Sequence, residues 1–280
     1  MKAGMIGLGA MGLGMARNLA KAGYLSAVYN RTAAKTTEFK MPAYPSPEAL
    51  AAEVDIVLIC VSADQDVLEI VDAIAKTIKP GAIVVDMPTV SSETAKKAAA
   101  ILAEKQAAFL DAPVSGGVEG AKNSTLAMMV GGDGEALEKA RPVLAAMTSR
   151  IMHMGATGSG QATKAVNQVM CAGINQAVTE ALAFAQAQGL AMDKVIDVIS
   201  GGASGNWFLE HRGSTMTHGT FASGFKLALH HKDLKICQEM AAQTGFSIPL
   251  ADMTVSDYEQ LMTKGYNDED ISALYRLKKR

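Results

Sequence analysis

Three glycines near the start of the chain constrain its fold more than any other feature. Gly7, Gly9 and Gly12 form the pattern G-x-G-x-x-G between an apolar stretch at 3–8 and a helical pattern at 11–22. In such a unit the first glycine permits a tight turn, the second lets the backbone approach a pyrophosphate, and the third lets helix and strand pack closely. An ordinary glycine turn is the alternative. The flanking strand and helix favour a dinucleotide-binding loop made of Gly7, Leu8, Gly9, Ala10, Met11 and Gly12.

The residues after the second strand, at 25–29, indicate which dinucleotide is bound. NAD sites usually carry Asp or Glu about twenty residues beyond the motif, where it binds the ribose 2′-hydroxyl. This chain has Asn30, Arg31 and Thr32 there instead. A guanidinium can bind a 2′-phosphate through two hydrogen bonds, and polar neighbours can add others. A solvated loop arginine is the alternative. We therefore expect NADP(H) to be preferred, with NAD(H) still open.

Strand and helix patterns alternate through the rest of the first half. We expect strands at 55–61, 82–87, 108–112, 125–130 and 150–153, and helices at 64–78, 91–106 and 134–146. This alternation predicts a parallel doubly wound sheet, in which ligands bind at the carboxyl ends of the strands. Those ends carry Cys60-Val61-Ser62, Pro88-Thr89 and Ser115-Gly116-Gly117. A serine followed by two glycines can present a hydroxyl and consecutive N–H groups to a carboxylate, although a plain glycine turn is the alternative.

A stretch of nearly thirty residues without proline, at 158–188, predicts one long helix. Most of its circumference is apolar, so we expect it to be buried. One face is polar, with Lys164, Asn167, Cys171, Asn175 and Thr179 spaced three or four residues apart. An unpaired lysine or amide inside a protein costs several kcal/mol, so this face needs a function or a partner. Polar residues that reach solvent at one edge are the alternative. We expect Lys164 and Asn167 to act in chemistry, and Asn175 and Thr179 to serve packing or subunit contacts.

After the long helix the pattern is helical only. We expect helices at 193–200, 225–244, 256–264 and 271–277, with a loop at 201–207. The fold class is therefore an α/β dinucleotide-binding domain of the Rossmann type at 1–157 and an all-α domain at 158–280. The neighbouring His230 and His231 point in different directions on a helix, so we expect no metal site there. Lys232 and Asp233 can be an ordinary solvated pair.

The overall composition excludes several classes of protein. A formal net charge of −2 provides no basic field for nucleic acid or anionic lipid. Cys60, Cys171 and Cys237 are odd in number and far apart, which indicates a reducing compartment rather than a disulfide framework or a zinc site. The glycine-rich N-terminus is not a signal peptide, and no apolar run of about twenty residues occurs. We expect a cytoplasmic protein without a membrane segment.

Four ordered motifs make the chain similar to the β-hydroxyacid dehydrogenases, the family that includes 3-hydroxyisobutyrate dehydrogenase and the glyoxylate/succinic semialdehyde reductases. They are IGLGAMGLGMARNL at 6–19, DAPVSGG at 111–117, GSGQATKAVNQ at 158–168 and FKLALHHKDL at 225–234. The resemblance covers essentially the whole chain. It implies a dinucleotide-binding domain and a helical domain joined by a long helix, in a homodimer or homotetramer.

The resemblance also assigns roles to individual residues. It implies that Lys164 is catalytic and that Asn167 orients the substrate near it. The residues implied to bind the substrate carboxylate are Ser115, Gly116 and Gly117, and Lys232 would reach toward nicotinamide and substrate. Those implied to contact the cofactor, besides the glycine loop, are Asn30, Arg31, Thr32, Cys60, Val61, Ser62 and Thr89. The segment Asn30-Arg31-Thr32 resembles the NADP-preferring version of the family.

Two positions depart from the family pattern. Pro88 stands where serine is commoner, and this departure puts the nicotinamide contact in doubt. Gln168 stands where some members have a second asparagine, and this departure leaves the role of that amide open.

Together these observations predict reversible hydride transfer between NADP(H) and a small carboxylate-bearing aldehyde or its hydroxy acid, with Lys164 as general acid and base. An imine reductase-like enzyme and a non-catalytic dinucleotide-binding protein are the alternatives. Imine reductases usually lack the lysine, and a non-catalytic relative would have lost the other motif residues. The substrate itself stays open, as does the choice among Trp207, Phe208, His211 and Arg212 for lining its pocket.

Overall fold

The structure is a computed structural model that describes residues 1–279, and the chain divides into two compact units, Met1–Lys164 and Ala165–Arg280. The division falls inside the long helix, so that helix belongs to both units. Each unit has its own hydrophobic core and is described separately below.

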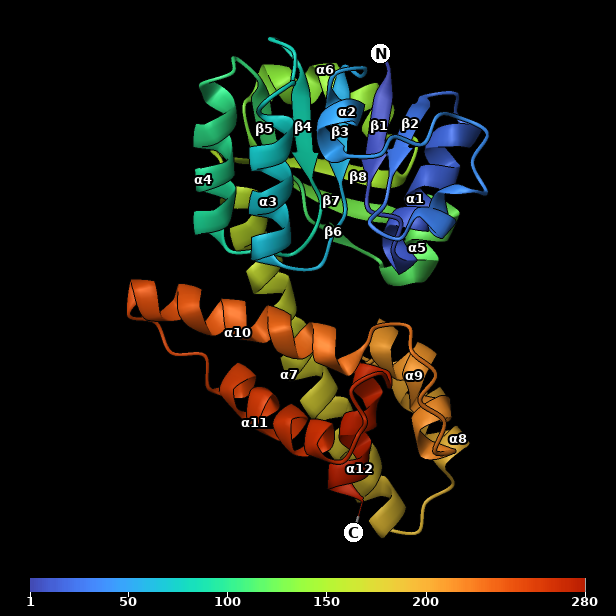
Figure 1. Cartoon of the computed structure of the whole chain (residues 1–280). Helices are drawn as coiled ribbons and strands as arrows, with labels where there is room; N and C mark the ends of the chain where they lie inside the picture. The colour runs from blue at the N-terminus through green and yellow to red at the C-terminus, as the bar shows by residue number, and fades with distance from the viewer. Residues whose placement is uncertain (280) are drawn as a thin grey trace. The chain divides into compact units, whose positions relative to one another are not determined.

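Unit 1 alternates strands and helices (Figure 1). Its elements are β1 (Ala3–Ile6), α1 (Ala10–Lys21), β2 (Leu25–Tyr29), η1 (Ala33–Thr36), α2 (Pro47–Ala51), β3 (Ile56–Ile59), α3 (Asp64–Ile74), β4 (Ile83–Asp86), α4 (Ser92–Ala103), β5 (Ala108–Asp111), β6 (Val114–Ser115), α5 (Gly117–Asn123), β7 (Leu126–Gly132), α6 (Gly134–Leu144) and β8 (Thr148–Gly155). The predicted strands and helices of this half are all present. The short η1, α2, β6 and α5 lie outside the prediction, because too few residues in each leave no periodic pattern.

The sheet has the order β2-β1-β3-β4-β5-β7-β6, with β8 pairing β7. The first five strands are parallel. From β1 the chain crosses to β2 on one side and then to β3 on the other, so the strand order reverses at β1. In open α/β sheets ligands bind outside the carboxyl ends of the strands at such a reversal point. The loops that follow β1, β2, β3 and β4 therefore define the place for a ligand.

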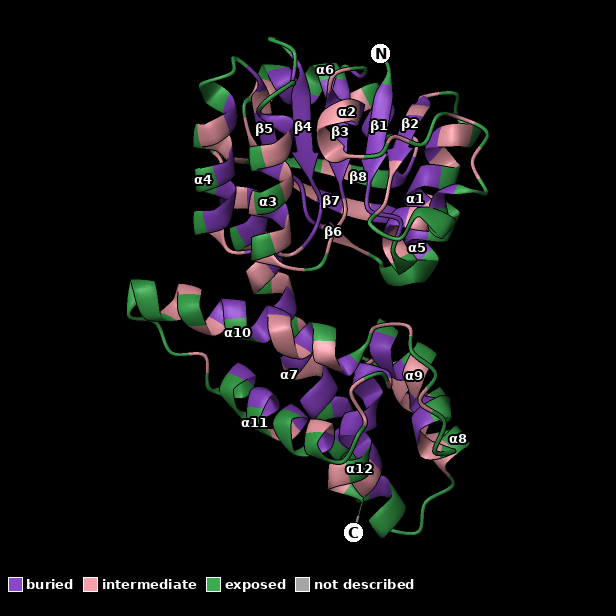
Figure 2. Cartoon of the chain, viewed as in Figure 1, coloured by how far each residue is buried: buried purple, intermediate pink, exposed green. Residues whose placement is uncertain are grey.

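Alternating side chains of the strands build two cores, one on each face of the sheet. Met5, Leu58 and Val85 pack with α1, α5 and α6 on one face. Their neighbours in sequence, such as Ile6 and Val57, pack with α2, α3 and α4 on the other face. The strands β1, β3 and β4 are buried along their whole length (Figure 2). A continuous apolar run is typical of a strand covered on both faces, which is why these strands are recognisable in the sequence.

The prediction of a purely parallel sheet is wrong for its last strands. β7 runs antiparallel to both β5 and β6, and β8 runs parallel to β7. The reason lies in α5, which packs on α1 on the same side of the sheet: Asn18 donates a hydrogen bond to the carbonyl oxygen of Ala121 (2.7 Å). A helix this short reverses the direction of the chain but does not carry it back to the end of the sheet where β5 begins. Strand β7 therefore runs antiparallel to β5.

Unit 2 is formed by helices around a core of its own. Its elements are α7 (Ser159–Ala187, entering from unit 1), α8 (Met192–Ser200), α9 (Trp207–Thr217), α10 (Leu227–Thr244), α11 (Pro249–Thr263), η2 (Ile271–Leu274) and α12 (Tyr275–Lys278). Helix α9 is missing from the prediction, and α11 begins seven residues before the predicted helix at 256–264. Asn206 caps α9 by accepting a hydrogen bond from the Leu209 N–H, and this cap was a cue in the sequence. No helix in the part of the chain that is described is long and apolar enough to cross a membrane.

The expectation that α7 is buried is wrong for part of its circumference. Val166, Met170 and Phe184 expose 63%, 62% and 66% of their surface, whereas Asn175 and Thr179 of the polar face are fully buried. The polar face therefore does not mark a solvent-facing edge. The donors of its inner members have partners, since Asn175 donates to the Tyr258 hydroxyl (2.9 Å) and Thr179 donates to a helix carbonyl one turn earlier.

A buried acid ends the fourth strand. Asp86 pairs in register with Ile59 on β3 and Asp111 on β5, and it has no exposed surface. Neither of its carboxyl oxygens has a hydrogen-bond partner among the described residues. Burial raises the pKa of Asp86 well above its ordinary value, and the nearby Asp111 and Asp64 raise it further. The fold therefore favours the neutral acid at this position.

This leads to a prediction about stability and pH. A raised folded-state pKa means that the contribution of Asp86 to stability is complete below the unfolded pKa of about 3.9 and is lost as pH rises toward the folded-state value. Asp86→Asn removes this titration, so its free energy of unfolding relative to wild type should increase from about pH 5 to pH 8, by at most about 1.4 kcal/mol per pH unit. Urea unfolding across that range measures it. The exposed Asp72 on α3 provides the control, Asp72→Asn. A difference between Asp86→Asn and wild type that is constant with pH would contradict the assignment.

Candidate active site

The glycine loop after β1 has the shape that a pyrophosphate requires. A side chain at Gly7 would collide with the carbonyl oxygen of Cys60, and one at Gly12 would collide with that of Gly7. Gly7 also has φ +97°, in the region that favours glycine. At Gly9, by contrast, an added Cβ would meet no protein atom within 4 Å. Neighbouring protein atoms thus account for two of the three glycines, while Gly9 borders space that a ligand can fill.

Helix α1 begins at this loop with its N–H groups open to a ligand. Its N-cap is Gly9, so no side chain caps the helix, and its first turn holds no acid. The first N–H groups of a helix have no intrahelical partner, and the positive end of the helix dipole favours an anion. The predicted loop residues therefore lie at a helix N-terminus that is suited to a pyrophosphate, and their contact with the cofactor stays a prediction.

Asn30 has contacts within the chain besides the cofactor contact that is predicted for it. Its Oδ1 accepts a hydrogen bond from the Leu8 N–H (2.8 Å), and its Nδ2 donates to the Thr32 carbonyl oxygen (2.9 Å). The side chain thus ties the end of β2 to the glycine loop. A contact to the cofactor stays a prediction for Asn30, Arg31 and Thr32.

Arg31 is exposed, and the fold brings an acid to it. Its side chain is 89% exposed, and its Nη1 lies 3.6 Å from Oδ1 of Asp66 in the first turn of α3. The segment after β2 carries no carboxylate, but the fold brings the carboxylate of Asp66 on α3 close to Arg31. An exposed pair at this distance is worth little energy. Asp66 nevertheless places a negative charge beside the group expected to bind a 2′-phosphate.

The loops after β3 and β4 carry the other predicted cofactor contacts. The Gly12 N–H donates to the Cys60 thiol, but burial of the thiol, helped by the nearby Asp86, raises the pKa of Cys60 to about 12. Cys60 is therefore a neutral thiol at physiological pH and no nucleophile. In the β4–α4 loop, Thr89 is partly exposed between the buried Pro88 and Val90. Val61 is partly exposed and Ser62 is exposed, so both are accessible to a ligand.

The predicted carboxylate-binding segment lies at the turn from β6 to α5. Ser115 pairs with Ala127 of β7, and the next two residues, Gly116 and Gly117, are exposed with φ of +130° and +63°. Two consecutive positive φ values require glycine. Ser115 is therefore held by the sheet, and its neighbours expose backbone to solvent.

Lys164 lies in the first two turns of α7, which are fixed on the sheet by Asp111. The carboxylate of Asp111 accepts hydrogen bonds from the N–H groups of Gly158 (2.7 Å) and Gln161 (2.9 Å). A side chain at Gly160 would collide with the carbonyl oxygen of Asp111, so helix and strand meet backbone to backbone. Lys164 itself is 7% exposed. The lysine of the polar face is thus buried, on a turn that two hydrogen bonds to Asp111 hold on the sheet.

In unit 2 the polar residues form one chain of hydrogen bonds. Asn167 donates to Oε1 of Gln168 (2.8 Å), and Nε2 of Gln168 donates to Oδ2 of Asp233 (2.6 Å). The other oxygen of Asp233 lies 2.8 Å from Nζ of Lys232. Asp233 is buried, so the idea of an ordinary solvated Lys232–Asp233 pair is wrong. The departure at Gln168 has a structural partner, because a longer amide reaches α10.

His230 and the aromatic residues of α9 have structural contacts. His230 is buried between Tyr258 (3.0 Å from Nδ1) and the Gln168 carbonyl oxygen (3.3 Å from Nε2), and no group of side chains within residues 1–279 is arranged to hold a metal ion. Of the four residues left open for a pocket, Phe208 belongs to the core, and Arg212 pairs with the buried Asp270 (3.3 Å). Trp207 and His211 stack on each other at 4.2 Å, and both are exposed.

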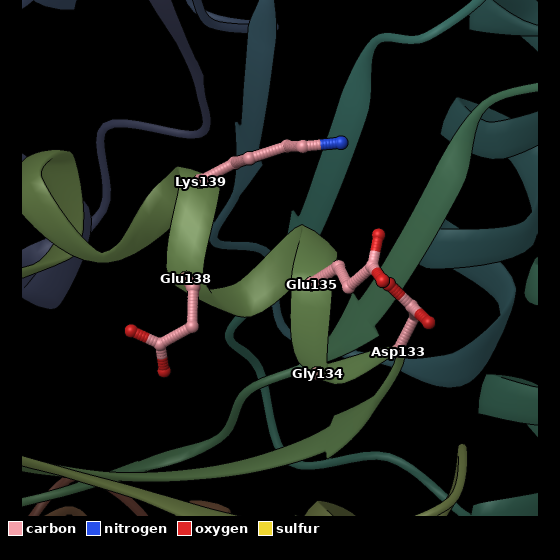
Figure 3. A pocket seen from close by; sticks show the side chains of 5 residues that line it. All are labelled: Asp133, Gly134, Glu135, Glu138 and Lys139. Carbon is pink, nitrogen blue, oxygen red and sulfur yellow. The ribbon is translucent and has the colours of Figure 1, made fainter.

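A surface pocket at the start of α6 contains none of these residues. It is lined by Asp133, Gly134, Glu135, Glu138 and Lys139 (Figure 3). Asp133 caps α6 by accepting from the Ala136 N–H (2.8 Å), and Glu138 pairs with Arg141 on the same helix. Asp133 and Glu138 thus stabilise α6 locally. The pocket is separate from the candidate site, because it contains none of that site's residues.

Comparison with known proteins covers both units. Residues 2–155 match the family described as the NAD binding domain of 6-phosphogluconate dehydrogenase, and residues 158–278 match the NAD-binding family of NADP-dependent 3-hydroxyisobutyrate dehydrogenase. The chain is 35% identical to the NAD-dependent L-serine dehydrogenase of Pseudomonas aeruginosa, over 97% of this chain and 96% of that one. The chain belongs to the β-hydroxyacid dehydrogenase family.

Other β-hydroxyacid dehydrogenases agree with this assignment. The 2-hydroxy-3-oxopropionate reductase of Escherichia coli is 34% identical over 98% of this chain and 96% of its own. The solved structure of Mycobacterium tuberculosis 3-hydroxyisobutyrate dehydrogenase with L-serine has a TM-score of 0.89 and 32% identity, covering 99% of this chain and 98% of that one. The protein is thus an NAD(P)-dependent β-hydroxyacid dehydrogenase with a Rossmann-type domain followed by a helical domain.

Sequence reasoning missed residues that act on the site through hydrogen bonds. Asp111, Gln161 and Gln168 lie inside recognised motifs, yet no role was assigned to them. For Gln161 a signal existed, because it precedes Lys164 by three residues and shares its face of the helix. The sequence contains no such signal for Asp66, because its approach to Arg31 depends on the packing of α3.

The contact between Asn30 and Leu8 predicts how the loop responds to mutation. Asn30→Ala removes the acceptor that fixes the glycine loop, so binding of NADPH and NADH should weaken by a similar factor, about tenfold for one lost hydrogen bond of roughly 1–1.5 kcal/mol. Isothermal titration with both cofactors measures it, each serving as the control for the other. Loss of NADPH binding alone would instead mean that Asn30 contacts the 2′-phosphate.

Proposed function

We propose that this β-hydroxyacid dehydrogenase interconverts a small carboxylate-bearing aldehyde and its hydroxy acid with NADP(H), using Lys164 as general acid and base. The observation that carries the proposal is Lys164 itself, a buried lysine on the turn of α7 that Asp111 fixes to the carboxyl edge of the sheet. This lysine lies in the same unit as the glycine loop that is expected to hold the cofactor.

The reaction requires a hydride transfer and a proton transfer. A bound nicotinamide cofactor would supply the hydride-transfer chemistry in both directions. The carbonyl oxygen then needs one proton, which the Lys164 ammonium donates during reduction. In oxidation the neutral Lys164 amine removes the hydroxyl proton as the hydride leaves. Proton transfer by a positioned side chain typically contributes a factor of about 10² to 10⁴ in rate.

The remaining residues divide between substrate and positioning. Ser115, Gly116 and Gly117 offer a hydroxyl and exposed backbone for a substrate carboxylate. Asn167 and Lys232 belong to one hydrogen-bonded chain in unit 2, and we assign them the orientation of substrate. Relatives named for L-serine and for 2-hydroxy-3-oxopropionate support a short substrate with a carboxylate next to the reacting carbon chain.

The role of Lys164 predicts a separation of turnover from binding. Lys164→Ala should reduce kcat by about a thousandfold or more, because the proton donor is gone, while NADPH still binds. Lys164→Arg is the matched variant, since it keeps the charge but does not transfer a proton at neutral pH. Steady-state kinetics and cofactor titration of both variants test it. An alanine variant that keeps most of its rate would show that the assignment is wrong.

The preference for NADP(H) rests on Arg31 and is opposed by Asp66. Arg31→Ala should weaken NADPH binding by about tenfold and leave NADH binding unchanged, because one charged contact to the 2′-phosphate is lost. Asp66→Asn should strengthen NADPH binding selectively, since a negative charge near that phosphate is removed.

The measurement is an absorbance screen at about 340 nm of glyoxylate, short semialdehydes and serine-like 3-hydroxy acids with both cofactors. Wild-type protein that is more active with NADH would overturn the inference from Arg31. Equal responses of both cofactors to Asp66→Asn would show that this acid acts elsewhere.

A further inference from the structure

One buried amide in unit 1 bridges the two peptide groups on either side of Thr89. Gln161 is 1% exposed. Its Oε1 accepts a hydrogen bond from the Val90 N–H (3.1 Å), and its Nε2 donates to the Pro88 carbonyl oxygen (2.8 Å). A single side chain thus satisfies one donor and one acceptor of the β4–α4 loop.

The loop is held on its other side by α3. Asp64 accepts hydrogen bonds from the Ser91 N–H (2.9 Å) and from the Thr94 hydroxyl (2.6 Å). Pro88 and Val90 are buried and bonded to Gln161, whereas Thr89 between them is partly exposed. The backbone on both sides of Thr89 is therefore held by hydrogen bonds to Gln161.

Gln161 also belongs to the turn that carries the lysine. Its own N–H donates to Asp111 (2.9 Å), so its backbone is fixed to β5 while its side chain is fixed to the loop after β4. Lys164 follows three residues later on the same face of α7. The peptides around Thr89 and the turn of Lys164 are therefore joined through one residue.

We propose that Gln161 is a positioning residue that sets the Thr89 loop at a fixed distance from Lys164, so that hydride and proton transfer occur in one geometry. The inference rests on the proposed role of Lys164. Reacting groups need to be placed within a fraction of an ångström, and a displacement of about 1 Å can cost a factor of about 100 in rate. Gln161 needs no contact with substrate to have this effect.

A purely structural role for Gln161 has a different signature. A buried amide that only satisfies backbone groups would lower stability when removed, and the folded fraction would react as before. Ser92 provides the matched control, because its hydroxyl donates to the Gly158 carbonyl oxygen (2.9 Å) and so joins α4 to the same end of α7 without touching the peptides around Thr89.

The experiment compares Gln161→Met, Gln161→Glu and Ser92→Ala in the full chain. Methionine keeps the volume of the side chain and removes both hydrogen bonds, whereas glutamate keeps only the acceptor for the Val90 N–H. We expect Gln161→Met to lower kcat by about tenfold to a hundredfold, while NADPH affinity changes by less than about threefold. Gln161→Glu should lower kcat as well, because the Pro88 carbonyl loses its donor. Ser92→Ala should lower the melting temperature but keep kcat within about twofold of wild type.

The decisive readout is the primary deuterium isotope effect with NADPH labelled at C4. It does not depend on the fraction of protein that is folded, so partial unfolding leaves it unchanged. Mispositioning slows the hydride step and should raise the effect on kcat in both Gln161 variants but not in Ser92→Ala. Gln161 variants with wild-type kcat, or with lower kcat and an unchanged isotope effect, would overturn the proposal.

Failure of the wider function has a separate outcome. If Lys164→Ala stays active, the proposed function falls, whatever the Gln161 variants do. If Lys164→Ala is inactive and both Gln161 variants retain wild-type kinetics, only the positioning role falls. Should Gln161→Met not fold, Gln161→Glu carries the same comparison.

Discussion

The carboxylate of Asp111 holds the first turn of α7 on the sheet, and the candidate site of unit 1 depends on this contact. It accepts two N–H groups from the start of the helix at 2.7 and 2.9 Å. Burial raises the pKa of Asp111, while the hydrogen bonds from Gly158 and Gln161 act in the opposite direction. The cost of burying a carboxylate is thus offset by donors that the helix needs to satisfy anyway.

Helices α1 and α7 both begin at the carboxyl edge of this sheet, and their N-termini differ in one respect. At α7 the positive end is occupied by Asp111 from the protein itself. At α1 the N-cap is Gly9, with no capping side chain and no acid in the first turn. The N-terminus of α7 is therefore anchored to the sheet through Asp111, whereas the N-terminus of α1 is open to an anion. An acid introduced near Gly9 would compete with a pyrophosphate in the way that Asp111 satisfies α7.

Much of this organisation is predictable from sequence, because it is local. The strands of the sheet read as apolar runs since both faces are covered, and the long helix is continuous from Ser159 to Ala187. The need for glycine at Gly7 and Gly12 is also local, because close backbone approach leaves no room for a side chain there. The antiparallel direction of β7 and the approach of Asp66 to Arg31 are not predictable from sequence. Both the direction of a strand and a contact between separate segments depend on tertiary packing. Periodicity missed α9, where the buried residues do not form a continuous apolar stripe.

The position of Gln168 shows how a departure from a family pattern can be compensated. Where some relatives have asparagine, the longer amide of Gln168 reaches Asp233 on α10 and accepts the Asn167 amide in return. Asp233 in turn holds the Lys232 ammonium at 2.8 Å. Asn167, expected to orient the substrate, and Lys232, expected to reach toward it, are therefore connected through the side chains of Gln168 and Asp233. Because buried polar groups of this kind depend on one another, removing Gln168 would leave the Asp233 carboxylate without one of its donors and would shift Lys232 together with Asn167. The helical domain thus contributes its polar groups as a single prearranged set, as Gln161 and Asp111 do for Lys164 in the sheet domain.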